Sequence, residues 1–358
     1  MSRRSWAVID LGALRHNLSK VRHYAPGTRI MAAIKADAYG HGAIQAAQAL
    51  EDADAFAVAS LAEALQVRQS GIRKPVVLLG GVLDADELQH ATGHDLQIAI
   101  HDFHQLALIE RNVHAHTAAI WIKLDTGMHR LGFAPEAIAE VCRRLAALPG
   151  LRLQGWMTHF ASADETGNPY TSRQIKTFRY ALAGVAGSRS LANSAGIVAW
   201  PDSHADWVRP GIMLYGASPI AGKSAEVLGL RPVMTLRSRV LSVRELPAGE
   251  PVGYGGCWIT PERMRIGVLA IGYGDGYPRH APDGTPILIG GRRVPLVGRV
   301  SMDLVTVDLR GCDGVREGDE AVLWGEGLPA DEIAGAAGTI AYELFCGLSR
   351  RVEYCYED

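Results

Sequence analysis

Short apolar runs alternate with longer stretches of mixed polarity along the first part of the chain. These runs lack turn-forming residues, which is typical of strands covered on both faces. They predict strands near residues 30–35, 55–59, 75–79, 96–100, 118–124, 153–159, 189–193 and 206–209. The Ala- and Leu-rich stretches between them favour helices at 43–51, 61–70, 84–92, 102–111, 135–147 and 171–186. Eight strands alternating with helices predict an α/β fold whose N-terminal part is a (β/α)8 TIM-type barrel. An open doubly wound sheet is the alternative, but no Gly-x-Gly-x-x-Gly motif follows the first strand.

The pattern changes near Leu230, where short strand-like runs separated by Gly- and Pro-containing turns replace the alternation. These runs predict strands at 233–245, 264–271, 286–289, 293–300, 305–309 and 321–324, with helices at 329–334 and 340–346. We therefore expect a barrel domain over residues 1–228 and a C-terminal mostly-β domain over residues 229–358. A short strand at about 5–10, before an amphipathic helix at 11–24, is a candidate to pack with the second domain.

Composition and charge exclude several classes of function. The 358 residues are 48% hydrophobic and 21% charged, as in a globular protein with a sizeable core. A net charge of −2 without a long basic block argues against a nucleic-acid surface, and no apolar stretch of about 20 residues predicts a membrane span. The five cysteines are scattered and the N-terminal apolar run is too short for a signal peptide, so we expect a cytoplasmic location. The histidines His90, His94, His101 and His104 resemble metal ligands, but no nearby carboxylate is arranged with them for a site, so we expect no metal.

Lys35 is the most informative residue of the first predicted strand. The apolar run from Ile30 to Ile34 ends at this lysine, and Gly40 and Gly42 follow before the next helix. A lysine at the end of a buried strand is desolvated, which disfavours its ammonium form and makes its amine nucleophilic. Such an amine can form a Schiff base with an aldehyde cofactor; the alternative is a lysine that extends to solvent.

The segment Lys35-Ala-Asp-Ala-Tyr39-Gly-His-Gly42 closely resembles the cofactor-lysine motif of the alanine racemases, and the resemblance spans essentially the whole chain. These are barrel-fold enzymes that use pyridoxal 5'-phosphate (PLP). The resemblance implies racemisation of L-alanine and D-alanine, for peptidoglycan synthesis or alanine catabolism, by a homodimer with shared active sites. It implies two catalytic bases, Lys35 and Tyr254, with the tyrosine supplied by the partner subunit.

The predicted ends of the last two barrel strands fit a phosphate site, because barrels of this kind commonly bind phosphate there. Ser194 offers a hydroxyl group, and Gly211 lets backbone N–H groups approach a dianion closely. The resemblance assigns phosphate contacts to Tyr39, Ser194, Gly211, Ile212 and Tyr342.

The resemblance places Arg209 at the ring nitrogen of the cofactor, where an arginine can only donate a hydrogen bond. The ring then stays unprotonated, which discourages decarboxylation and transamination. Without the resemblance, Arg209 reads equally as a surface arginine before a turn proline.

One lysine reaches one face of the substrate only, so racemisation needs a second proton-transfer group. Tyr254 lies between glycines in Gly253-Tyr-Gly-Gly256, so its ring can project from a turn into a neighbouring site. His159, at the end of a predicted strand, is a candidate to link Tyr254 to Arg209, although a single histidine is more often structural.

The remaining candidates concern the substrate. Arg130 is the candidate for the cofactor phenolic oxygen and the substrate carboxylate, a role suited to a charged fork. Lys123 would brace Arg130 if it were carbamylated, as the matching lysine often is in the family, and would repel it otherwise. The resemblance gives Met302 a backbone contact to the carboxylate and makes Tyr273 and Tyr342 a narrow mouth. Loop charges that line the approach in this interpretation are Asp164, Arg279 and Arg299.

Two functions compete with racemisation. An amino-acid decarboxylase of the same two domains would need an acid at the ring nitrogen and a Gly-rich phosphate loop, where this chain has Arg209 and Ser194. A non-catalytic cofactor carrier would be a single barrel, and the second domain with Tyr254 and Met302 opposes that interpretation.

Overall fold

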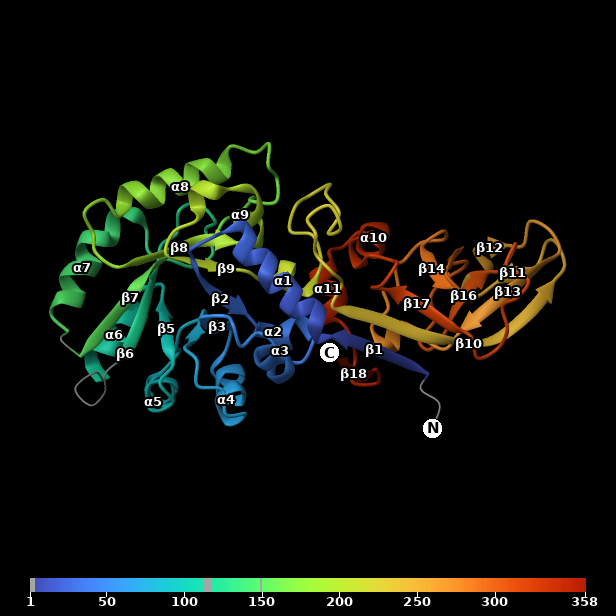
Figure 1. Cartoon of the computed structure of the whole chain (residues 1–358), viewed down its shortest axis with the longest axis horizontal. Helices are drawn as coiled ribbons and strands as arrows, with labels where there is room; N and C mark the ends of the chain where they lie inside the picture. Colours follow the sequence, from blue (N-terminus) through green and yellow to red (C-terminus); the bar gives the residue numbers. More distant parts are fainter. Residues whose placement is uncertain (1–3, 113–117, 149) are drawn as a thin grey trace.

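The computed structural model describes residues 4–112, 118–148 and 150–358, which form a barrel domain and a mostly-β domain side by side (Figure 1). Eight parallel strands close the barrel in the order β2-β3-β4-β5-β6-β7-β8-β9. These strands are Arg29–Ala33, Ala55–Val58, Val76–Leu78, Gln97–Ile100, Ala118–Lys123, Leu151–Met157, Ser188–Asn193 and Trp207–Arg209. The predicted (β/α)8 barrel is therefore confirmed.

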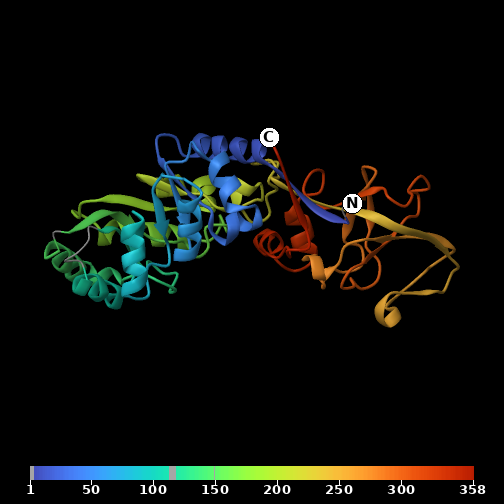
Figure 2. The same cartoon turned by 90° about the horizontal axis from the view of Figure 1, so that it is seen from below.

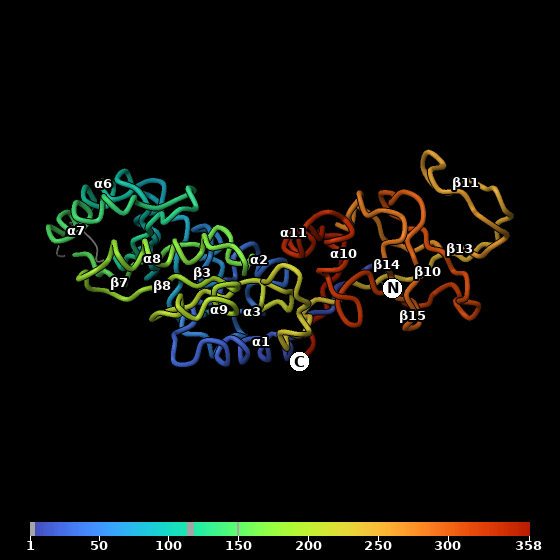
Figure 3. The backbone as a smooth tube through the Cα atoms, turned by 90° about the horizontal axis from the view of Figure 1, so that it is seen from above, coloured from blue at the N-terminus to red at the C-terminus, as the bar shows by residue number. Residues whose placement is uncertain are grey.

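The barrel helices pack around the strands and cover their outer faces (Figures 1 and 3). They are α1 (Leu11–Tyr24), α3 (Ala43–Ala49), α4 (Leu61–Gln69), α5 (Ala85–Gly93), α6 (Phe103–Asn112), α7 (Ile138–Ala146) and α8 (Tyr170–Ala181). Two short segments, α2 (Lys35–Gly40) and α9 (Ser194–Ala199), directly follow the ends of β2 and β8. Short 3-10 turns are η2 (Pro135–Ala137), η3 (Pro201–Ser203) and η4 (Ile212–Tyr215).

Side chains that alternate along the strands separate the barrel into two cores. Inward-pointing residues form a small cluster inside the barrel, made of Met31, Ala55, Ala57, Val77, Ala99, Trp121, Met157 and Trp207. Their neighbours along the strands, such as Ile30 and Ile98, belong to the larger cluster between strands and helices. The filled interior closes the barrel below its carboxyl-terminal end, so a ligand can enter only above it.

The second domain is built on a sheet whose longest strand is β10 (Met234–Leu246). The same sheet contains β1 (Ser5–Asp10), β13 (Met264–Leu269), β14 (Pro286–Ile289), β15 (Arg292–Pro295), β16 (Val305–Asp308), β17 (Glu320–Trp324) and β18 (Glu353–Glu357). Two further strands, β11 (Pro251–Val252) and β12 (Trp258–Ile259), form a separate two-stranded sheet. Two short helices, α10 (Ala330–Ala336) and α11 (Ala341–Cys346), and two turns, η5 (Tyr254–Gly256) and η6 (Tyr273–Asp275), complete it.

The first and last strands of the chain join the two domains. β1 pairs antiparallel with β10 and parallel with β18, so the N-terminal strand lies in the sheet of the second domain (Figure 2). Asn17, on α1, is fully buried and donates to the carbonyl oxygens of Leu214 and Arg231 at 2.9 and 2.8 Å. This contact fixes α1 against the segment that leads out of the barrel.

Several predicted boundaries differ from the structure. The strand predicted at 293–300 ends at Pro295, the helix predicted at 171–186 ends at Ala181, and the first barrel strand ends at Ala33, before Lys35. The prediction also missed the short pair β11 and β12, the last strand β18 and the helix α9. Among the described helices, none combines the length and the apolar composition that crossing a membrane requires.

Candidate active site

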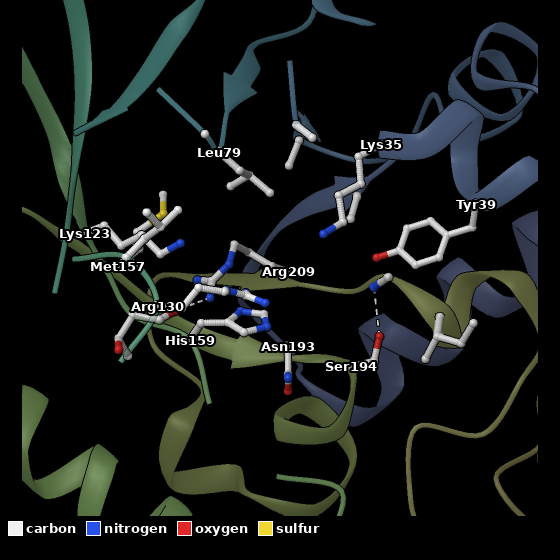
Figure 4. A pocket seen from close by; sticks show the side chains of 18 of the residues that line it. Lys35, Tyr39, Leu79, Lys123, Arg130, Met157, His159, Asn193, Ser194 and Arg209 are labelled. Atoms are coloured by element: carbon white, nitrogen blue, oxygen red, sulfur yellow. Dashed lines mark hydrogen bonds between the residues drawn. The ribbon is translucent and has the colours of Figure 1, made fainter. Parts of the chain in front are cut away.

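A cavity of about 420 Å³ opens at the carboxyl-terminal end of the barrel (Figure 4). Its lining includes ten of the predicted site residues, namely Lys35, Tyr39, Lys123, Arg130, His159, Ser194, Arg209, Gly211, Ile212 and Tyr342. Nine of these come from barrel strand ends and the loops after them, whereas Tyr342 comes from α11 of the second domain. The barrel therefore brings together residues that are far apart in the sequence.

Lys35 is followed by a left-handed turn. Ala36, Asp37, Ala38 and Tyr39 have φ between 51° and 54°, so the segment labelled α2 is a left-handed turn. Left-handed helical geometry costs about 1–2 kcal/mol per residue for residues with a Cβ atom, so tertiary contacts must hold it. Asp37 supplies one of these, because its Oδ1 accepts a hydrogen bond from the Ala43 N–H at 2.7 Å.

The turn carries Lys35 into the cavity from one side (Figure 4). Burial lowers the pKa of Lys35 below its ordinary value, and the charge of Arg130 lowers it further. A larger fraction of the amine is then neutral near pH 7 than in a free lysine, which is the nucleophilic form.

Three cations and a histidine lie across the cavity from Lys35 (Figure 4). Burial lowers the pKa of Lys123 to about 8, helped by the charges of Arg209 and Arg130. Burial and the neighbouring Arg209 and Lys123 also hold the pKa of His159 well below its ordinary value, so its imidazole is neutral. A cavity with this excess of positive charge favours a ligand with several negative charges.

Arg209 is held rigidly by the barrel. Its two terminal nitrogens donate to the carbonyl oxygens of Ser190, Thr158 and Leu191 and to the Ser190 hydroxyl group. These four contacts use four of the five N–H groups of a guanidinium. Within the described part of the chain, Nε–H is the donor left without a protein partner, so Arg209 can offer one hydrogen bond to a ligand in the cavity.

Ser194, Gly211 and Tyr39 form a corner of the cavity. The Ser194 hydroxyl oxygen accepts from the Gly211 N–H at 2.8 Å, which joins the start of α9 to the loop after β9 (Figure 4). A Cβ atom at position 211 would lie 2.5 Å from the Tyr39 hydroxyl oxygen, so any other residue there would displace the Tyr39 ring. Side-chain oxygens accept from N–H groups at the start of both α9 and η4. The Gly196 N–H at the start of α9 donates to Asn193 Oδ1 at 2.9 Å, and the Ser194 hydroxyl oxygen also accepts from the Met213 N–H at 3.4 Å. A dianion in this corner would meet the Ser194 hydroxyl group and the backbone at Gly211 and Ile212.

Comparisons with known proteins identify the family. Residues 9–219 match the N-terminal domain of alanine racemase and residues 233–356 match its C-terminal domain. The alanine racemase of Halorhodospira halophila is 51% identical over 354 residues, which are 98% of this chain and 97% of the relative. The chain belongs to the alanine racemase family. It is accordingly an isomerase, as its curated relatives in this family are.

Solved structures of alanine racemases agree with this assignment. The biosynthetic alanine racemase from Pseudomonas aeruginosa is 45% identical, with a TM-score of 0.97 and 100% of both chains covered. The alanine racemase from Acinetobacter baumannii is 38% identical, with a TM-score of 0.95 over 99% of this chain and 100% of that chain.

Three of the predicted site residues do not line the cavity of their own chain. Tyr254, Tyr273 and Met302 lie in the second domain and are 70%, 41% and 53% exposed. Tyr254 follows β11, which lies at the end of the second domain farthest from the barrel (Figure 3). Of the expected rim residues, Asp164 lines a neighbouring cavity with Tyr342, whereas Arg279 and Arg299 are exposed in the second domain.

The prediction missed several residues that also line the cavity, namely Ala33, Ala57, Ala59, Leu79, Gly80, Leu131, Met157, Thr158 and Asn193. Most are apolar or small, so they carry no chemical signal, and only their positions near predicted strand ends could have pointed to them. Among the described residues, no group of three or more His, Cys, Asp or Glu side chains is placed to hold a metal ion.

Proposed function

We propose that this chain interconverts L-alanine and D-alanine with PLP held by Lys35. The observation that carries the proposal is a cavity in which Lys35, whose pKa is lowered, faces several cations. The same cavity includes the corner formed by Ser194, Gly211 and Tyr39. When bound, PLP supplies an electron-withdrawing ring that makes the Cα proton of an attached amino acid acidic.

The lining residues fit this group. The phosphate would be held by Ser194, the backbone at Gly211 and Ile212, and the hydroxyl groups of Tyr39 and Tyr342. Arg209 would donate its free Nε–H to the ring nitrogen, which keeps that nitrogen unprotonated because an arginine has no proton to give up at neutral pH. This arrangement limits the electron withdrawal and favours return of the proton to Cα over other outcomes.

Charged and backbone donors would fix the substrate carboxylate. Arg130 lines the cavity near Lys123 and His159 and is the cation in reach of a carboxylate there (Figure 4). The backbone N–H of Met302 and the ring of Tyr273, both supplied by the partner subunit, would complete the pocket. A carbamylated Lys123 would turn its repulsion of Arg130 into attraction.

We assign the two proton transfers to Lys35 and to Tyr254 of the partner subunit. The Lys35 Nζ takes or returns the Cα proton on one face of the substrate, and the Tyr254 Oη does so on the other. The exposure of Tyr254, at the far end of the second domain from its own cavity, supports a site completed by a second copy. The functional unit is then a homodimer with two shared sites, in which residues 1–228 hold the cofactor and residues 229–358 supply the second base. We place it in the cytoplasm, where it provides D-alanine for peptidoglycan or serves alanine catabolism.

Incubation of the purified chain with PLP and L-alanine, followed by chiral chromatography, tests the activity. Accumulation of D-alanine toward an equal mixture is expected. Release of carbon dioxide, or no reaction, refutes the proposal. Reduction with borohydride and peptide mass spectrometry must then find the cofactor on Lys35, and a label on another lysine refutes the assignment of that residue.

A further inference from the structure

Glu63 connects the turn after Lys35 to the next strand of the barrel. Its Oε1 accepts a hydrogen bond from the Ala36 N–H at 2.7 Å. Its Oε2 accepts from the Ala59 N–H at 2.7 Å and from the Ser60 N–H at 3.2 Å. One carboxylate thus bridges the residue that follows Lys35 and the loop after β3.

Glu63 makes one hydrogen bond more than helix capping requires. Glu63 lies in the first turn of α4, where Ser60 and Glu63 form a reciprocal capping box. Glu87 occupies the same position in α5, where Asp84 accepts from the Glu87 N–H at 2.8 Å and the Glu87 Oε2 accepts from the Leu83 N–H at 2.9 Å. Both of these hydrogen bonds stay within one loop and the helix that follows it, whereas Glu63 uses its second oxygen to hold a neighbouring unit.

The bridged segment needs such a contact. Ala36 is the first of four consecutive non-glycine residues with φ above 50°, a conformation that local preference opposes. Burial lowers the pKa of Lys35, as do the charges of Arg130 and Arg209, whereas the Glu63 carboxylate raises it. The same carboxylate therefore acts on the position of the turn and on the charge of the amine.

We propose that Glu63 is a positioning residue for Lys35, which holds the left-handed turn so that the amine faces the cavity. The inference deepens the proposed function, because it rests on Lys35 as the residue that holds PLP and moves a proton.

Glu63→Gln and Glu87→Gln are the matched variants, because both remove a first-turn carboxylate and only the first touches the Lys35 turn. Lys35 is titrated in the full-length chain, after removal of PLP, by trace labelling with acetic anhydride at a series of pH values and peptide mass spectrometry. We expect the pKa of Lys35 to be lower in Glu63→Gln than in the wild type and to be the same in Glu87→Gln as in the wild type. After reconstitution with PLP, we expect kcat to fall about ten- to a hundredfold in Glu63→Gln with little change in KM, because a displacement near 1 Å is enough for such a loss.

The inference is overturned if Lys35 titrates at the same pH in Glu63→Gln and in Glu87→Gln. It is also overturned if the two variants have the same kcat. If Glu63→Gln does not fold, Glu63→Asp replaces it and Glu87→Asp becomes the control. The shorter carboxylate cannot span both loops, so an unchanged kcat in Glu63→Asp also overturns the inference. A wild-type chain without racemase activity would instead refute the proposed function, and the labelling comparison on Lys35 would still decide the role of Glu63.

Discussion

Replacing Gly211 by alanine should weaken PLP binding through a steric effect on Tyr39. The new Cβ atom would lie 2.5 Å from the Tyr39 Oη and 3.1 Å from its Cζ, whereas ordinary contacts begin at 3.4 Å. The phenol group must therefore retreat by about 0.9 Å. Its ring is buried and packs against Tyr215 and Tyr342, with ring centres 4.8 and 5.8 Å apart, so little room exists for the movement.

The size of the effect follows from this crowding. Inserting one methyl group into a well-packed region costs about 1–3 kcal/mol. The free chain can relieve part of the strain by moving Tyr39 away, but bound phosphate requires the hydroxyl group to return. If the full strain is felt only in the complex, the Kd for PLP rises by roughly 5- to 150-fold.

Absorbance titration of the cofactor-free chain with PLP measures this Kd for the wild type and for Gly211→Ala. Gly93→Ala is the control, because a Cβ atom at position 93 meets nothing within 4 Å. Urea unfolding of both variants shows whether strain appears in the free chain instead. A Kd within twofold of the wild type, with unchanged unfolding, would refute the assignment of Gly211 and Tyr39 to the phosphate corner.

Three further predictions address the second base, the modified lysine and the domain junction. Tyr254→Phe should keep the colour of bound PLP, but its rate of racemisation, measured by chiral chromatography, should fall about 10²- to 10⁴-fold. Tyr180→Phe is the control, because Tyr180 on α8 is 87% exposed, and its rate should equal that of the wild type. Full activity of Tyr254→Phe would exclude Tyr254 as a base. Carbamylation of Lys123 requires its neutral amine, and burial lowers the pKa of this lysine to about 8. The ¹³C NMR signal of a carbamate formed with labelled bicarbonate should therefore grow as the pH rises through 8. A signal that does not depend on pH, or no signal, contradicts this prediction. Asn17→Ala removes two hydrogen bonds that the side chain donates and one that it accepts from the Arg231 N–H. The free energy of unfolding in urea should therefore fall by about 2–4 kcal/mol. A fall below about 0.5 kcal/mol, the usual effect of a surface substitution, would contradict this prediction.

Periodicity predicted the barrel because each barrel strand has an inner and an outer core to contact, which leaves a continuous apolar run in the sequence. The rule that ligands bind at the carboxyl ends of barrel strands then placed Lys123, His159, Ser194 and Arg209 together. Lining residues such as Leu79 stayed hidden, because an apolar side chain at a strand end has the same local pattern as one in the core.

The left-handed turn after Lys35 could not be predicted from local preference. Ala36, Asp37, Ala38 and Tyr39 include no glycine, and two alanines favour an ordinary right-handed helix. The turn exists because contacts distant in the sequence hold it, such as the 2.7 Å hydrogen bond to Glu63. Sequence patterns of nearby residues do not record such contacts, so strained functional segments are where local prediction fails.

The division of work between the two domains has a physical reason. The barrel holds Arg209 through four hydrogen bonds, and such rigidity suits a group that must keep a fixed direction toward a ligand. If Lys35 moves the Cα proton, as proposed, this lysine reaches one face of Cα only, and the other face needs a second base. Tyr342 on α11 extends into the cavity of its own chain, but Tyr254 follows β11, which lies at the opposite end of the second domain (Figure 3). On the proposed function, each chain therefore contributes to two cavities, and association of two copies is a condition of racemisation because it supplies the base for the other face.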